Sequence, residues 1–239
     1  MIKSFLKDSE VLTSEGWMKV QDIKNVAVLL AQYSNDHKIV FLPPLGVDKE
    51  YGAIKASKIS QKGKEVISLP DSCEFVCAIK DKSGTKIGYD HPNFFQFGTS
   101  IKLINSGLGY TARKSITDYE LSQIVFGDYS WVNIGTMSAR MAMSFIERLD
   151  STEKKGKFEV LVKNKENADI LESIFTLTGY SFKVDSSKKG YKIIWNKTDN
   201  FISTNNFEVE AFDYSDEVTK IVINNYGIVS RINGRTLIV

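Results

Sequence analysis

The feature that most constrains the fold is a change of pattern in the middle of the chain. Residues 1–110 carry short strand-forming stretches separated by turn residues, and this pattern returns from residue 204 to the end. Residues 111–203 instead carry apolar residues at helical spacing. The two β parts must therefore pair with each other across the middle segment. Such pairing is plausible because loop-closure entropy grows only logarithmically with loop length.

Composition bounds the size of the core and the compartment. The 239 residues are 42% hydrophobic, which is enough for one sizeable core, or for one core plus a smaller inserted one. The formal net charge of +2 argues neither for nor against a nucleic-acid partner. No apolar run is long enough to span a membrane, and no secretory signal is evident at the start. Cys73 and Cys77 lie beside apolar residues and are expected to be buried free thiols, which suits a cytoplasmic location.

The first part is expected to form short strands joined by turns, as in an all-β body. Pro43 and Pro44 end one of these strands because proline cannot donate to a ladder. The turn at 82–85 is consistent with a hairpin. The expected strands are 8–13, 26–33, 38–42, 66–69, 74–80, 86–89 and 101–104.

The middle segment contains two strong helix signals. Apolar residues recur every four positions from Met137 to Leu149, and a second apolar face runs from Lys165 to Thr178. Gly179 follows the second helix at the position that favours a positive φ. A weaker helix start is expected near Ser115. With strands at 158–162, 180–184 and 191–195, this segment is expected to be an α+β unit.

The two ends together resemble the Hint fold of inteins and hedgehog autoprocessing domains. The resemblance rests on Ser4-Phe-Leu-Lys-Asp-Ser-Glu-Val-Leu-Thr-Ser-Glu-Gly-Trp17 at the start and on Val229-Ser-Arg-Ile-Asn-Gly-Arg-Thr-Leu-Ile-Val239 at the end. It implies that the opening and closing strands lie side by side and that the groups for self-directed peptide-bond chemistry sit at the two ends.

The resemblance also implies a catalytic residue set at the opening end. Ser4 matches the first nucleophile, whose hydroxyl would attack the carbonyl before it, at the Lys3–Ser4 bond. His91 matches the histidine of a Thr-x-x-His motif and would donate a proton to the amide nitrogen, a role suited to histidine. Gly88 stands where the family has threonine, so one hydroxyl is lost.

The closing end departs further from the family pattern. Inteins end in asparagine followed by a nucleophilic residue, whereas this sequence stops at Val239. Asn233 belongs to an Asn-Gly turn of the last hairpin. Lys220 stands at a position in the penultimate strand that is often Cys or Asp. As read, the chain is therefore expected to perform at most an N-terminal acyl shift and autocleavage, without splicing and without a cofactor.

The middle segment resembles half of a LAGLIDADG homing endonuclease, a unit that commonly sits inside inteins. The resemblance rests on Ser138-Ala-Arg-Met-Ala-Met-Ser-Phe-Ile-Glu-Arg-Leu-Asp150 and on the segment 167–180. It implies that Asp150 would hold Mg²⁺ at a scissile phosphate. Ser151 replaces the usual glycine, and Asp128 is the one candidate for a second acidic residue. Since a metal site needs convergent carboxylates, we expect a decayed unit.

DNA binding without cleavage is a separate possibility. Basic residues lie on and around the hairpin that would face DNA, where they could contact phosphates. The alternative is a hairpin whose aromatic residues pack on the two helices. The candidate DNA-binding residues are Lys183, Lys188, Lys189, Lys192 and Lys197.

The sequence therefore predicts an α+β protein in which an all-β Hint-like module, residues 1–110 and 204–239, is interrupted by a LAGLIDADG-like insertion, residues 111–203. The expected partner is the host polypeptide in which the element is embedded, in a bacterial or phage setting. Two alternatives stay open. One is a Hint scaffold that serves as a structural subunit of a phage assembly. The other is a protein that binds or cleaves double-stranded DNA through residues 111–203.

Overall fold

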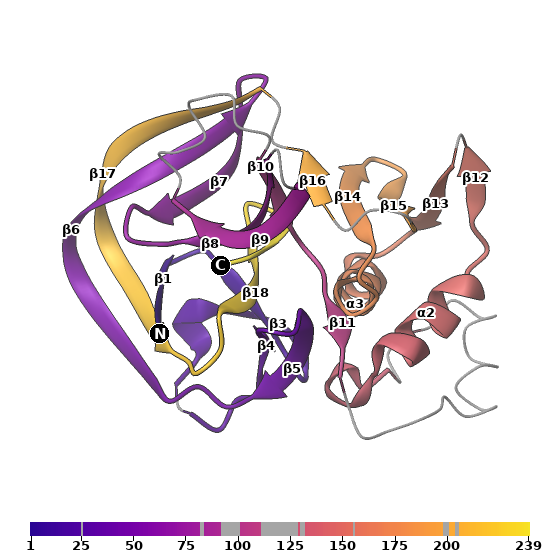
Figure 1. Ribbon diagram of the computed structural model, residues 1–239, viewed down its shortest axis with the longest axis horizontal. Coiled ribbons are helices and arrows are strands. Elements are labelled where there is room, and N and C mark those ends of the chain that lie inside the picture. The colour runs from indigo at the N-terminus through magenta and orange to yellow at the C-terminus, as the bar shows by residue number, and fades with distance from the viewer. Residues whose placement is uncertain are drawn as a thin grey trace.

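A computed structural model describes residues 1–24, 26–81, 84–91, 101–110, 129, 132–154, 156–197, 201–203 and 206–239. The described part is mostly β-structure with two α-helices, arranged as a large β body with a smaller layer of helices and strands on one side (Figure 1). None of the described helices is long and apolar enough to cross a membrane.

Two long strands form the outer wall of the β body. β6 (Gly46–Gln61) and β17 (Phe207–Val222) pair antiparallel along their whole length and curve together in Figure 1. β1 (Ile2–Leu6) pairs with the far end of β17, and β7 (Lys64–Pro70) pairs with β6. The pairing of β1 and β17 confirms that the two ends of the chain lie side by side.

Two further sheets complete the body. The first has the order β16-β10-β8-β9, and the second has the order β11-β5-β4-β18-β2-β3 with β19 added on β18. The first contains β16 (Phe201–Ser203), β10 (Ile101–Ile104), β8 (Phe75–Asp81) and β9 (Gly84–Asp90). The second contains β11 (Leu108–Gly109), β5 (Lys38–Leu42), β4 (Leu30–Tyr33), β18 (Gly227–Ile232), β2 (Glu10–Thr13), β3 (Gly16–Lys19) and β19 (Arg235–Ile238). Short 3₁₀ turns occur at η1 (Val20–Asp22) and η3 (Ile134–Thr136).

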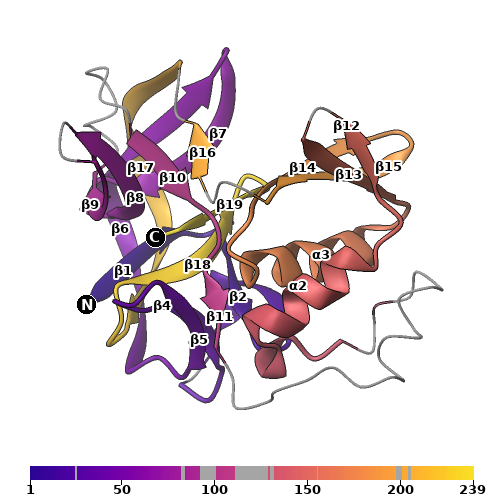
Figure 2. The same ribbon diagram turned by 45° about the vertical axis from the view of Figure 1, so that its right-hand side comes forward.

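The middle segment folds as a four-stranded antiparallel sheet with both α-helices on one face (Figure 2). Its strand order is β12 (Thr152–Lys154), β13 (Lys157–Val162), β15 (Gly190–Asn196) and β14 (Ser181–Ser187). The helices are α2 (Ala139–Glu147) and α3 (Lys165–Thr176). Both predicted helices are thus confirmed, and each is slightly shorter than the apolar pattern from which it was predicted. The weaker helix start at Ser115 lies outside the described residues.

Both helices begin with a side-chain cap. The Ser138 side chain accepts a hydrogen bond from the Met141 N–H, and the Asn164 side chain accepts one from the Asn167 N–H. Such caps satisfy backbone donors that have no partner inside the helix.

The helical layer and the β body share one hydrophobic core. The cluster that holds Phe145, Phe175 and Trp195 from the middle segment also holds Leu12 and Val229 from the β body. A second cluster lies wholly within the β body and surrounds Phe5 and Phe75. The middle segment is therefore packed against the body rather than tethered to it.

Candidate functional site

The opening strand places Ser4 against the closing part of the chain. Ser4 lies in β1 directly opposite Lys220 of β17 and is 8% exposed. Residues directly opposite each other in an antiparallel pair project from the same face of the sheet. The Lys220 ammonium reaches Glu50 at 2.6 Å. Lys220, which was expected in the penultimate strand, lies in β17, the third strand from the end, and is the cross-strand neighbour of the candidate nucleophile.

The ladder fixes the orientation of the Lys3–Ser4 peptide bond. Met1 and Ile223 exchange two backbone hydrogen bonds, of 2.7 and 2.8 Å. Hydrogen-bonded and non-hydrogen-bonded pairs alternate along an antiparallel ladder. The pair Lys3–Ile221 is therefore of the hydrogen-bonded kind, so the Lys3 carbonyl faces the Ile221 N–H. The Ser4 N–H points the other way, out of the ladder.

The Ser4 N–H meets the thiol of Cys73. The backbone N–H of Ser4 donates a hydrogen bond to this sulfur, which is fully buried in the turn before β8. Burial raises the pKa of Cys73 to about 11, although Lys3 and the Ser4 hydrogen bond lower it in part. The thiol is therefore protonated at neutral pH and is not itself an activated nucleophile. Both cysteines are buried free thiols, as the sequence predicted.

Lys3 is the most unusual residue of this region. It is 2% exposed, and its ammonium nitrogen has no hydrogen-bond partner among the described residues. The nitrogen lies 5.7 Å from the centroid of the Tyr89 ring. Burial lowers the pKa of Lys3, opposed by its electrostatic interactions with Cys73 and Glu74. The side chain before Ser4 is thus enclosed in the protein.

Glu74 connects Lys3 to His91. The Nε2 atom of His91 lies 3.4 Å from Oε1 of Glu74, and each side chain is a little over one-third exposed. The Asp90 carboxylate accepts a hydrogen bond of 2.9 Å from the His91 backbone N–H. Burial raises the pKa of Asp90, in opposition to its contacts with His91. The Glu74 carboxylate therefore contacts the imidazole and also interacts electrostatically with the Lys3 ammonium.

We group as the β1 site the residues linked to Lys3 and Ser4 by strand pairing or electrostatic interaction, together with His91, which contacts Glu74; they come from four parts of the chain. Sequence reasoning identified Ser4, His91 and Lys220 but did not include Cys73, Glu74 and Lys3. No motif marks these three, because their role depends on where the turn before β8 lies. The β1 site consists of Lys3, Ser4, Cys73, Glu74, His91 and Lys220.

The remaining residues of the Hint resemblance occupy defined places. Gly88 lies in β9 opposite Cys77, where an added Cβ would make an ordinary contact of 3.6 Å with Ile79. Asn233 and Gly234 have φ values of 50° and 74°, which confirms the predicted hairpin turn between β18 and β19. Val239 is fully buried and exchanges two backbone hydrogen bonds with Ile228.

Asp150 has little of what a metal site requires. It is exposed, beyond the end of α2, and no group of three or more possible metal ligands occurs within the described ranges. Asp128 lies outside the described residues. A single exposed carboxylate does not fit Mg²⁺, which needs convergent oxygen ligands. The assignment of Asp150 stays a prediction, and no metal-dependent step is derived from it.

The lysines predicted to bind DNA are partly engaged with carboxylates. Lys183 lies 2.5 Å from Asp185, Lys192 lies 3.1 Å from Glu159, and the Lys197 ammonium lies over the Phe158 ring. Lys188 and Lys189 are exposed in the β14–β15 turn. Because acidic and basic groups alternate on this surface, its net attraction for phosphates is reduced. DNA binding stays a prediction.

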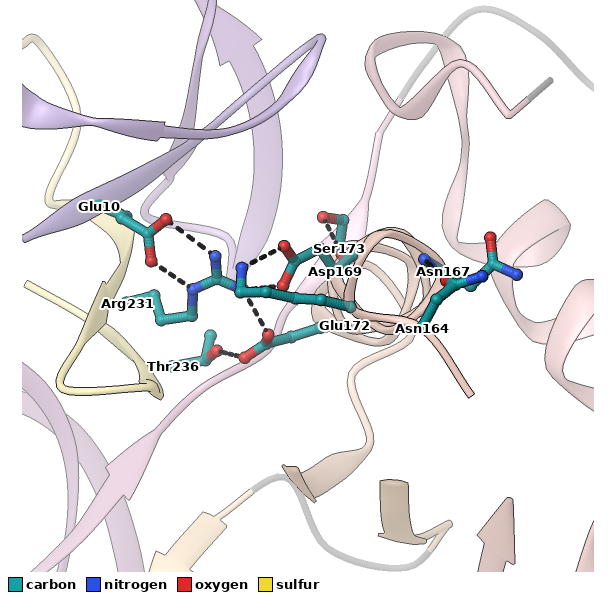
Figure 3. A network of polar contacts seen from close by, with 9 residues as sticks. Glu10, Asn164, Asn167, Asp169, Glu172, Ser173, Arg231 and Thr236 are labelled. Atoms are coloured by element: carbon teal, nitrogen blue, oxygen red, sulfur yellow. Dashed lines mark hydrogen bonds and ion pairs between the residues drawn. The ribbon is translucent and has the colours of Figure 1, made fainter. Parts of the chain in front are cut away.

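A buried ion network joins α3 to the β body (Figure 3). The guanidinium of Arg231 contacts Glu10 at 2.7 and 2.9 Å, Asp169 at 2.5 Å and Glu172 at 2.8 Å. The Thr236 hydroxyl donates to the other Glu172 oxygen. Burial lowers the pKa of Arg231, but the hydrogen bond to Glu10 and the nearby carboxylate charges outweigh burial and raise it. This network holds the helical layer in place.

Comparison with known proteins gives a distant likeness to a solved structure. No protein-family model matches the chain. No curated protein matches it either. Among solved structures, a GSH-linked, splice-inactive variant of the AceL NrdHF class 3 split intein matches with 9% sequence identity and a TM-score of 0.44, over 99% of this chain and 96% of that chain. A likeness this distant does not assign an activity, which must come from the residues of this chain.

Proposed function

We propose that this protein is an intein-like Hint element that retains an N-terminal acyl shift at the Lys3–Ser4 bond. The proposal is supported by the linked contacts of the β1 site: Lys220 lies opposite Ser4, and Glu74 interacts with both His91 and Lys3. The bond itself has a buried serine on one side and a carbonyl that faces a backbone donor of β17, and we propose that His91, held by Glu74, reaches its nitrogen. This is the combination that acyl transfer to a hydroxyl requires.

The proposed reaction conserves atoms within the chain. Oγ of Ser4 attacks the carbonyl carbon of Lys3, a C–O bond forms, and the C–N bond to Ser4 breaks. The hydroxyl proton passes to the His91 imidazole, which Glu74 contacts, and the imidazolium gives a proton to the departing nitrogen, which becomes the free amine of Ser4. The Ile221 N–H, which faces the Lys3 carbonyl, stabilises the negative charge that develops on its oxygen. Water or hydroxylamine then cleaves the ester and releases residues 1–3.

Cys73 has a positioning role in this proposal. Its raised pKa keeps it a neutral thiol, so it does not compete with Ser4 as a nucleophile. By accepting the Ser4 N–H it fixes the plane of the peptide bond that is to be cleaved. The host polypeptide that would precede Lys3 is the implied partner.

Intact mass of the full chain tests the proposal, after incubation with and without hydroxylamine. We expect a species that lacks residues 1–3 to accumulate with hydroxylamine, to be absent in Ser4→Ala, and to form about a hundredfold more slowly in His91→Ala. Ser9→Ala is the matched control, because Ser9 is equally buried a few residues further along and is outside the β1 site.

Glu74→Gln separates a role in the reaction from a purely structural role. Since the Glu74 carboxylate contacts the imidazole, this variant should slow cleavage while leaving the melting temperature unchanged, whereas a purely structural role would change both. Cleavage that persists in Ser4→Ala, or a wild-type mass that is unchanged with hydroxylamine, would exclude the acyl shift and leave the β1 site as a structural feature of the fold.

A further inference from the structure

A large groove lies between the helical layer and the β body, away from the β1 site. Its volume is about 630 Å³. One wall is β14 with the end of β15, and the opposite wall is the start of β7 with the β18–β19 turn. Figure 2 shows β19 reaching toward the end of β14. Asn105, Glu172 and Trp195 also line it.

The wall formed by β14 has a free strand edge. β14 is the last strand of its sheet, so one side of its backbone has no neighbouring strand in that sheet. Side chains of the β body occupy the start of this edge: Asn105 donates to the Phe182 carbonyl at 2.9 Å, and Ser106 donates to the Tyr180 carbonyl at 2.8 Å. Because backbone groups alternate in direction along a strand, the N–H and C=O of Val184 point out on this same side. An open edge of this kind can pair with another extended segment.

Two buried polar atoms in the groove lining have no partner among the described residues. They are Oδ1 of Asn105, an acceptor, and Nε1 of Trp195, a donor. The two residues are 1% and 2% exposed. Because neither atom is exposed, Asn105 and Trp195 form the buried wall of the groove and do not offer these atoms to a ligand.

The charges of the groove favour an acidic ligand. Its carboxylates are already engaged: Glu65 with Lys58 and Ser68, Asp185 with Lys183, and Glu172 with Arg231. In contrast, Lys64, Lys157 and Arg235 form no ion pair within the described part of the chain. Burial lowers the pKa of Arg235, with Asp185 opposing, so this guanidinium lacks full compensation. The unpaired charge in the groove is positive.

We propose that this groove binds an extended, acidic peptide segment of a partner polypeptide, which adds as a strand to the free edge of β14. Its backbone pairs with β14 near Val184, and its carboxylates lie near Lys64, Lys157 and Arg235. The proposal does not depend on the acyl shift, since the groove shares no residue with the β1 site.

The test is a titration of the full chain with an acetylated and amidated Glu-Val-Glu-Val-Glu peptide, followed by the Trp195 indole N–H signal in two-dimensional NMR. Trp195→Phe assigns that signal among the three tryptophans. We expect a saturable shift at a peptide concentration on the order of 1 mM or below. The double variant Lys157→Glu with Arg235→Glu should weaken binding by about tenfold or more.

Matched controls separate this site from general electrostatic attraction. The double variant Lys188→Glu with Lys189→Glu makes the same change in net charge as Lys157→Glu with Arg235→Glu. Its two residues lie in the β14–β15 turn, outside the groove, so it should leave binding unchanged. A Lys-Val-Lys-Val-Lys peptide should not bind, and a peptide with proline at its centre should bind more weakly because it lacks an N–H for the strand edge. The proposal is overturned if no saturable shift occurs, if both charge-reversal pairs act equally, or if the groove is filled by a second copy of the chain in a dimer at the working concentration.

Discussion

Arg231→Met is the perturbation whose effect follows most directly from the structure. Arg231 is 5% exposed and is the central cation for three carboxylates, those of Glu10, Asp169 and Glu172. Methionine has a similar length but carries no charge and no donors. The variant leaves these carboxylates without their shared partner, and Glu172 is itself 4% exposed. A buried carboxylate that loses its partner has no interaction left to offset the free-energy cost of its desolvation.

The expected cost is set by this uncompensated charge. Removing one partner of a buried ion pair typically costs about 3–5 kcal/mol. For a chain of this size, 1 kcal/mol corresponds to a shift of the melting temperature of about 2–4 °C. Arg231→Met should therefore lower the melting temperature by about 6–20 °C. Loss of the link between α3 and the β body should also make the unfolding transition less cooperative.

Thermal and urea unfolding followed by far-UV circular dichroism measure this cost. Arg235→Met is the matched control, because Arg235 lies on the same hairpin and has no ion pair within the described residues; its cost should be below about 1 kcal/mol. Adding Glu172→Leu to Arg231→Met should recover part of the loss, since the stranded buried carboxylate is removed. Equal melting temperatures for the two arginine variants would refute the reasoning.

Glu172→Gln should have a much smaller effect on stability than Arg231→Met. Burial raises the pKa of Glu172, although Arg231 and Thr236 lower it in part. A raised pKa means that the folded state binds more protons than the unfolded state, so this group's contribution to stability is lost as pH rises above the ordinary carboxyl range. Glutamine cannot ionise and therefore removes this loss of stability, while Arg231 keeps its ion pairs with Glu10 and Asp169. The variant should destabilise the protein less than Arg231→Met does, and it should flatten the pH dependence of unfolding above the ordinary carboxyl range.

Three further changes test other features of the fold. Lys3→Met should raise the melting temperature, because the buried Lys3 ammonium has no hydrogen-bond partner among the described residues. The lowered pKa of Lys3 means that the wild-type protein becomes more stable as the pH rises toward 10.5, and this pH dependence of stability should disappear in the variant. Asn164→Ala should cost about 1 kcal/mol in urea unfolding, because the cap on the Asn167 N–H at 2.8 Å is lost. Gly190→Ala should lower the free energy of unfolding by more than an ordinary glycine replacement does, because φ is +122° and the new Cβ would collide with the Val162 carbonyl. A loss below about 0.5 kcal/mol in urea unfolding would contradict this expectation.

The elements that could be predicted from sequence are those whose pattern carries burial information. α3 has a regular apolar face that ends just before Gly179, and its observed limits lie within two residues of the expected ones. The hairpin of β14 and β15 was marked by aromatic alternation and a turn rich in serine and lysine. In each case, one face of the element is buried against a neighbour, so the spacing of apolar residues along the sequence identifies the helix or strand directly.

β6 shows why other elements could not be predicted. No strand was expected between residues 46 and 61, yet this segment pairs with β17 along its full length. Its middle is exposed on both faces, and it contains Gly52 and several lysines, so no alternation of polar and apolar residues marks it. Its conformation is fixed by backbone pairing with a strand more than 140 residues away, which local sequence does not encode.

The same distinction explains what was found at the β1 site. Ser4 and His91 stand in recognisable sequence patterns, whereas Cys73 and Lys3 belong to the site only because the turn before β8 packs against β1. Burial of an unpaired lysine is a cost that the fold does not need, and so are the unpaired atoms of Asn105 and Trp195. Well-folded sequences tend to keep such local conflicts where function requires them. Unpaired buried atoms also occur at Trp17, Gln21 and Thr219, outside both places, so a missing partner does not by itself mark a functional residue, and a role for the β1 site or the groove has to rest on its geometry.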